Sequence, residues 1–226
     1  AVVNPNLSAA ATLSEALLFD SGAISRLGRI EDKNTTSDFD EEEQARGFSV
    51  NNAILPTEWQ DAKLNIIDAP GYLDFVGEVK SAIGVADGAV LVVCAASGVE
   101  VGAEVQWGYL NERPEPRMVF VNKMDRENAS FSRVLGQLNT KFDATFVPVS
   151  IPIGEASGFQ GVIDLVEMKA YLGPNARASD IPASAHSAAE EARLAMMEYA
   201  AEVDDDLMLK YLDGEQLTPE EVRRGL

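Results

Sequence analysis

The sequence has few of the residues that build disulfide-bonded or zinc-binding proteins. Its 226 residues include one cysteine, Cys94, and one histidine, His186. A single cysteine excludes an intrachain disulfide framework, and the shortage of both residue types excludes a Cys/His metal site. The sequence also lacks a signal-peptide pattern and any apolar run near the ~20 residues of a membrane span. We therefore expect a cytoplasmic protein with no membrane partner.

Positive charge is also scarce. Lys and Arg total 18 against 37 Asp and Glu, so the formal net charge is -19. This excess of acid argues against a general affinity for phosphate backbones, and we expect no sequence-specific binding to nucleic acid. The acidic residues are concentrated at 31–43 and in the C-terminal quarter around 204–206. We interpret both segments as solvated surface.

Short apolar segments alternate with amphipathic ones over the first 145 residues. Strands are expected at 63–67, 89–96 and 118–121, and helices at 73–86, 101–112 and 128–142. The strand at 89–96 is apolar throughout, which is typical of a central parallel strand. The alternation predicts an α/β fold, a mostly parallel sheet with helices on both faces, whose ligands bind at the carboxyl ends of the strands. Trp59 and Trp107 are expected to pack in its core.

The pattern changes near residue 145. Residues 146–153 contain two prolines and predict an edge strand. Two further strands are expected at 161–167 and 168–172, and one or two acidic helices at 185–212. We therefore divide the chain into a core at 1–145 and a small α+β subdomain at 146–226.

The strand expected at 118–121 is followed by the tetrapeptide Asn-Lys-Met-Asp. Guanine presents N1–H and N2–H donors on one edge and N7 and O6 acceptors on another. The Asp125 carboxylate is able to accept both donors, and adenine offers no such pair. The Asn122 amide is able to reach N7 and to brace the loop, while the Lys123 stem lies along the base. The tetrapeptide therefore predicts a guanine-specific site.

A second polar motif, Asp-Ala-Pro-Gly, follows the strand expected at 63–67. Asp68 in this position is suited to hold a Mg²⁺ ion through water. Gly71 has no side chain, so its backbone N–H is able to approach a terminal phosphate. Because both motifs end apolar strands, their order along the chain predicts a nucleotide-binding fold.

The sequence resembles bacterial elongation factor G, a translational GTPase, and most closely its elongation factor G-like paralogues. The resemblance lies in residues 14–47, 68–75, 87–98, 121–126, 147–154 and 161–164. It implies a P-loop GTPase-type domain with an insert subdomain, which binds GTP or GDP with Mg²⁺ and hydrolyses GTP on the ribosome during translocation or recycling. The implied partners are the ribosome and, through the acidic insert, a ribosomal stalk protein. The family's last guanine motif is missing, so we expect a fragment of a longer factor.

The resemblance also implies roles for individual residues. The residues that match the guanine-reading motif are Asn122, Lys123 and Asp125. The residues that match the element sensing Mg²⁺ and the terminal phosphate are Asp68 and Gly71. Ser49 stands where the first switch of the family usually has a threonine that binds Mg²⁺. Its hydroxyl keeps that role chemically feasible.

The phosphate loop departs from the family. Its pattern is Gly, four residues, Gly-Lys and then Ser or Thr, and the corresponding positions here are Asn4, Ala9, Ala10 and Ala11. Ala9 hinders a backbone that needs positive φ. Ala10 has no ammonium for the phosphates, and Ala11 has no hydroxyl for Mg²⁺. Backbone N–H groups at a helix N-terminus then remain to hold phosphate.

A second departure is Tyr72, which stands where elongation factor G has a histidine that positions the attacking water. Tyrosine is able to hydrogen-bond water, but its ordinary pKa is near ~10. Two functions therefore remain open. One is a domain that binds and hydrolyses GTP. The other is a degenerate, non-hydrolysing module of the same fold that acts in protein or ribosome interaction.

Overall fold

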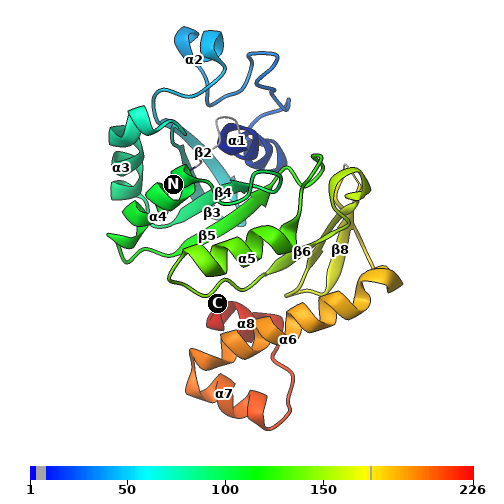
Figure 1. Cartoon of the computed structure of the whole chain (residues 1–226). Helices are drawn as coiled ribbons and strands as arrows, with labels where there is room; N and C mark the ends of the chain where they lie inside the picture. Colours follow the sequence, from blue (N-terminus) through cyan, green and yellow to red (C-terminus); the bar gives the residue numbers. More distant parts are fainter. Residues whose placement is uncertain (4–8, 174) are drawn as a thin grey trace. The chain divides into compact units, whose positions relative to one another are not determined.

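The computed structural model describes residues 1–3, 9–173 and 175–226, and Figure 1 traces the chain through them. The chain divides into two compact units. The first contains residues 1–123 and 136–142, and the second contains residues 124–135 and 143–226. Each unit has its own β-sheet. No helix in the described parts of the chain is long and apolar enough to cross a membrane.

The first unit is built on a five-stranded sheet in the order β2-β3-β1-β4-β5. The strands are β1 Val2–Val3, β2 Ala53–Trp59, β3 Ala62–Asp68, β4 Ala89–Cys94 and β5 Arg117–Asn122. All neighbouring pairs are parallel except β2 and β3, which form an antiparallel hairpin. Both residues of the hairpin turn, Gln60 and Asp61, have positive φ, as a type I′ turn requires. The mostly parallel α/β sheet predicted from the sequence is thus confirmed.

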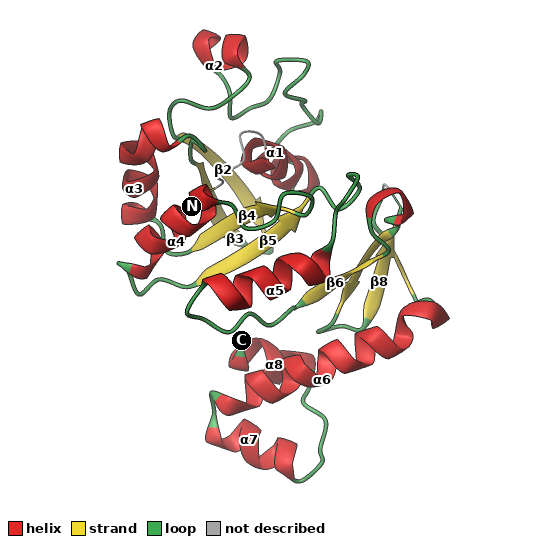
Figure 2. Ribbon diagram, viewed as in Figure 1, coloured by secondary structure: helices red, strands yellow, loops and turns green. Residues whose placement is uncertain are grey.

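Helices cover both faces of this sheet (Figure 2). They are α1 Ala9–Asp20, α3 Val76–Val85 and α4 Val101–Asn111, with the short α2 Glu41–Arg46 in the segment before β2. Helix α1 contacts β1, β3 and β4, whereas α3 and α4 pack on each other. The burial of strand β4 explains the long apolar run at 89–96, because Leu91, Val92 and Val93 have no exposed surface. Helix α5, Phe131–Lys141, spans the boundary between the two units.

The second unit contains a four-stranded antiparallel sheet in the order β6-β7-β8-β9. Its strands are β6 Ser150–Ile153, β7 Gly161–Asp164, β8 Lys169–Leu172 and β9 Arg177–Ser179. They are followed by α6 His186–Glu202, α7 Asp205–Leu212 and α8 Pro219–Gly225. Strand β6 lies at the edge of this sheet, as predicted, but it covers only the second half of the expected segment 146–153 and contains one of its two prolines. The acidic helical segment is two helices, because Asp204 caps α7 by accepting hydrogen bonds from the N–H groups of Asp206 and Leu207.

Three expectations need correction. The helix expected at 73–86 begins as a 3₁₀ turn at Leu73–Phe75 and becomes α-helical only at Val76. The helix expected at 128–142 begins later, at Phe131, since Asn128 has a φ of 63° that interrupts a helix. Trp59 is not a core residue, because it ends the edge strand β2 and is 50% exposed. Trp107 is buried as expected, and its ring stacks on Phe142.

Candidate nucleotide-binding site

Two of the predicted site residues lie at the carboxyl ends of parallel strands in the first unit. Asp68 is the last residue of β3 and Asn122 is the last residue of β5. Asp68 is in register with Val2 of β1, the strand that ends at Val3 just before the segment leading to α1. In doubly wound sheets this edge is where ligands bind.

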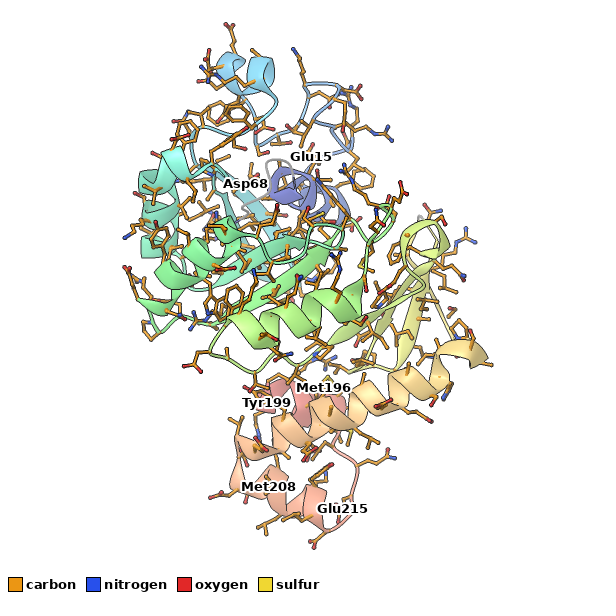
Figure 3. All side chains as sticks on the ribbon, viewed as in Figure 1. Glu15, Asp68, Met196, Tyr199, Met208 and Glu215 are labelled. Carbon is orange, nitrogen blue, oxygen red and sulfur yellow. The ribbon has the colours of Figure 1, made fainter. Side chains whose placement is uncertain are left out.

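Asp68, labelled in Figure 3, is an acidic side chain that is almost completely buried, with 1% exposure. The pKa of this carboxyl is raised to about 7, mainly by burial and in smaller part by the nearby charges of Asp38 and Glu43. The hydroxyl of Ser37 opposes this increase in part, although its geometry falls short of a hydrogen bond. Neither oxygen of Asp68 accepts a hydrogen bond from any residue that the structure describes. Buried acceptors without donors are suited to a hydrated cation.

Ser49, the expected Mg²⁺ ligand of the first switch, lies in the loop between α2 and β2. Its Oγ donates a hydrogen bond to Oδ1 of Asp38 at 2.8 Å. This bond uses the hydroxyl hydrogen and leaves the oxygen lone pairs for a cation. Among the described residues, no group of three or more His, Cys, Asp or Glu side chains is arranged to hold a metal ion. A cation at Asp68 and Ser49 would therefore draw further ligands from water and phosphate.

Tyr72 lies in the loop between β3 and the 3₁₀ turn, directly after Gly71. Its ring packs against the ring of Phe48, which is the residue before Ser49. The guanidinium of Arg46, the last residue of α2, lies 5.9 Å from the centroid of the Phe48 ring. The residue in the position of the family's histidine is thus held by an aromatic contact, and Gly71 is half-buried beside it.

The guanine motif begins at the end of β5. The Asn122 side chain braces the loop by accepting a hydrogen bond from the N–H of Lys123 at 2.7 Å. Lys123 has a φ of 61°, so the chain turns sharply immediately after the strand. The boundary between the two compact units falls after Lys123. Asp125 belongs to the second unit, and it is exposed.

The phosphate-loop positions are described only in part. Asn4 lies outside the described residues, and Ala9 is the first residue of α1. The side chains of Ala10 and Ala11 are each 4% exposed. Ala10 packs in a small apolar cluster with Val2 and Val92. The position that usually carries the lysine therefore presents a buried methyl group.

Sequence reasoning missed three buried carboxylates, Glu15, Asp38 and Glu43. The interpretation of residues 31–43 as solvated surface is wrong for Asp38 and Glu43, because both accept hydrogen bonds inside the folded segment. The signal for Glu15 is its position on α1, where it shares a buried stripe with Ala11 and Leu18 at helical spacing.

Comparison with known proteins identifies the family. Residues 11–208 match the family described as the elongation factor Tu GTP binding domain. The chain belongs to this family of translational GTPases. A crystal structure of a protein from Thermus thermophilus is similar, with a TM-score of 0.88 and 33% sequence identity, covering 99% of this chain and 34% of that one. The chain of this translational GTPase thus spans about a third of the length of that relative. The family match begins at residue 11, so it leaves out Asn4, Ala9 and Ala10.

Proposed function

We propose that this domain binds GTP and GDP with Mg²⁺ and forms the nucleotide-binding part of an elongation factor G-like ribosome factor. The observation that carries the proposal is Asp68, a buried carboxylate at the end of β3 with no hydrogen-bond donor among the described residues. Membership of the elongation factor Tu GTP-binding family supports the choice of guanine nucleotide.

Each residue of the site would have a separate task. Asp125 would accept the N1–H and N2–H groups of guanine, while Asn122 and Lys123 would hold the N7 edge and the base plane. Asp68 would hold Mg²⁺ through water, and Ser49 would hold it through its hydroxyl. The bound ion would supply positive charge opposite the phosphates. The N–H of Gly71 would bind the terminal phosphate.

The factor as a whole would act in the cytoplasm, on the ribosome, during translocation or recycling. We assign residues 1–145 to the GTPase core and residues 146–226 to the insert, whose acidic surface would contact a ribosomal stalk protein. Tyr72 would orient the water that attacks the γ-phosphate in line.

A second function is a module of the same fold that no longer hydrolyses GTP and acts in protein or ribosome interaction. The buried methyl groups of Ala10 and Ala11 favour it, because they replace the ammonium and hydroxyl that grip phosphate. Contact between Tyr72 and Phe48 also favours it, since the ring is engaged in packing against another side chain.

Calorimetric titration of the chain with GTP, GDP and ATP, with and without Mg²⁺, tests the first function. The decisive variant is Asp125→Asn, since the asparagine amide suits the O2 of xanthine in place of the N2–H group of guanine. We expect GTP affinity to fall roughly tenfold to a hundredfold, with a gain for xanthosine triphosphate. Asp143→Asn is the matched control, because it makes the same chemical change at an exposed position outside the motif.

Two results would reject the first function. One is GTP binding by the unaltered chain weaker than about millimolar, an affinity near 4 kcal/mol. The other is an Asp125→Asn variant that keeps its preference for GTP over xanthosine triphosphate. Ribosome binding without nucleotide dependence would then support the second function.

A further inference from the structure

Three buried carboxylates hold together the segment that connects α1 to β2. Glu15 and Glu43 are each 1% exposed, and Asp38 is 5% exposed. No Lys, Arg or His among the described residues forms an ion pair with any of them. A buried charge without a counter-ion is stable only when hydrogen bonds satisfy it. Here the donors that the structure describes come from the connecting segment itself.

Glu15, which Figure 3 labels, lies on α1 and attaches the first part of the segment to this helix. Its Oε1 accepts hydrogen bonds from the N–H of Gly28 at 3.0 Å and from Oγ1 of Thr36 at 3.3 Å. Its Oε2 accepts a hydrogen bond from the N–H of Thr36 at 2.8 Å. A Cβ atom at Gly28 would lie 2.5 Å from Oε1, so the backbone approaches the carboxylate as closely as only glycine allows.

Glu43 binds backbone N–H groups in the last part of the segment. Its Oε1 accepts hydrogen bonds from the N–H groups of Val50 and Asn51 at 2.8 and 3.0 Å. Its Oε2 accepts a weaker one from the N–H of Asp40 at 3.3 Å, which completes a capping box at the start of α2. One side chain thus fixes both ends of the turn that carries Ser49.

Asp38 lies between these two anchors and binds side chains instead of backbone. Its Oδ1 accepts the hydrogen bond from Oγ of Ser49, and its Oδ2 accepts one from Oγ1 of Thr35 at 3.1 Å. It also lies within electrostatic reach of Asp68. The hydroxyl of Ser49 is therefore oriented by a buried carboxylate that is itself held by Thr35.

We propose that Asp38 is a positioning residue for Ser49, and that Glu15 and Glu43 hold this arrangement before nucleotide binds. In GTPases whose switch loops are ordered by the γ-phosphate and its Mg²⁺, the loop is released when that contact is lost. Here the loop is held by carboxylates of the protein. The orientation of Ser49 toward Mg²⁺ rests on the proposed function, whereas the folding of the loop does not.

Amide hydrogen exchange of the nucleotide-free chain tests the two anchors. In the unaltered protein, the N–H groups of residues 28, 36, 40, 50 and 51 should exchange at least roughly tenfold more slowly than in an unstructured peptide. Glu15→Gln should accelerate exchange at 28 and 36 only, and Glu43→Gln should accelerate it at 40, 50 and 51 only. Unprotected amides in the unaltered chain, which become protected only with GTP and Mg²⁺, would overturn the proposal.

Side-chain NMR couplings of Ser49 in the nucleotide-free chain test the role of Asp38. We expect one χ1 rotamer in the unaltered chain, averaging over rotamers in Asp38→Ala, and recovery in Asp38→Asn, whose amide oxygen still accepts the hydrogen bond. The amide protection described above should not change in either variant. An unchanged Ser49 rotamer in Asp38→Ala would reject the positioning role, as would loss of the amide protection.

A parallel titration with GTP and Mg²⁺ separates this proposal from the proposed function. If the chain binds no GTP but keeps its amide protection and its Ser49 rotamer, the proposed function is rejected and the present proposal is supported.

Discussion

The ring of Tyr72 meets the ring of Phe48 edge to face, with centroids 4.4 Å apart and planes inclined at 62°. The contact links the loop after β3 to the loop before β2. Edge-to-face pairs contribute about 0.5–1.5 kcal/mol beyond the area they bury. The residue proposed to orient the attacking water therefore also packs against Phe48, and we expect this contact to slow hydrolysis.

Replacing Tyr72 by histidine is expected to increase single-turnover GTP hydrolysis at least about tenfold, because an imidazole has a pKa suited to proton transfer near neutral pH. The dissociation constant for GTP should change little. Tyr72→Phe is the control, since it keeps the ring contact and removes the hydroxyl. A histidine variant no faster than the phenylalanine variant would show that residue 72 does not limit the reaction.

Restoring the phosphate loop with the double change Ala10→Lys and Ala11→Thr is expected to tighten GTP binding. The gain should be on the order of 1.5–3 kcal/mol for the charge-assisted contact, measured by calorimetry. Ala10→Met is the control, because it adds a similar stem without the charge where Val2 and Val92 pack. If the double variant binds no tighter than Ala10→Met, the ammonium is not the missing element.

The buried Asp68 should make stability depend on pH. Its pKa of about 7 in the folded chain exceeds the ordinary value of 3.8, so the folded state retains a proton that the unfolded state releases. Its contribution to stability is complete below about pH 4 and is lost as the pH rises to about 7, a total on the order of 4 kcal/mol at most.

Denaturant titrations from pH 4 to 8 measure this contribution. As the pH rises across this range, the unaltered chain should lose stability from Asp68, whereas Asp68→Asn should not, since the amide does not titrate. The free energy of unfolding of the variant should therefore increase relative to that of the unaltered chain. Asp61→Asn, an exposed change in the turn between β2 and β3, should leave the pH profile as it is. Parallel profiles for Asp68→Asn and the unaltered chain would contradict the assignment.

The core of the second unit depends on Met196, which has no exposed surface and packs among the buried residues of α6, α7 and α8. Met196→Ala should lower the free energy of unfolding of this unit by about 2–5 kcal/mol, since it leaves a cavity. Leu194→Ala is the control two residues away, because Leu194 is 58% exposed. Equal effects of the two changes would mean that α6 packs through a different face.

Strand β4 was predictable because a strand buried on both faces is apolar at every position. Strand β2 was not, since the apolar Ile54 and Trp59 are exposed and the polar Thr57 is buried, so residue type does not mark its buried face. Strand β1 contains only Val2 and Val3, too few residues for any periodicity. Local sequence therefore revealed strands that contain a clear run of apolar residues, and it missed those that are too short or whose apolar residues do not mark the buried face.

The same limit applies to the site. Asp68 and Asn122 were predictable because each immediately follows an apolar strand. The partners of Glu15 were not predictable, because these hydrogen-bond donors lie 13 and 21 residues away along the chain. Glu43 belongs to an acidic run that is typical of a solvated surface, and only the folding of the loop around it supplies its donors.

Pro56 affects the association of copies of this protein through the edge of the first sheet. It lies within β2, the strand at the open edge of the first sheet, opposite Asn65 of β3. An exposed edge strand offers hydrogen-bond donors on which a strand of another molecule could add. A proline has no N–H to contribute, so β2 offers one hydrogen-bond donor fewer to such a strand. We therefore expect Pro56 to weaken edge-to-edge association between copies of the protein.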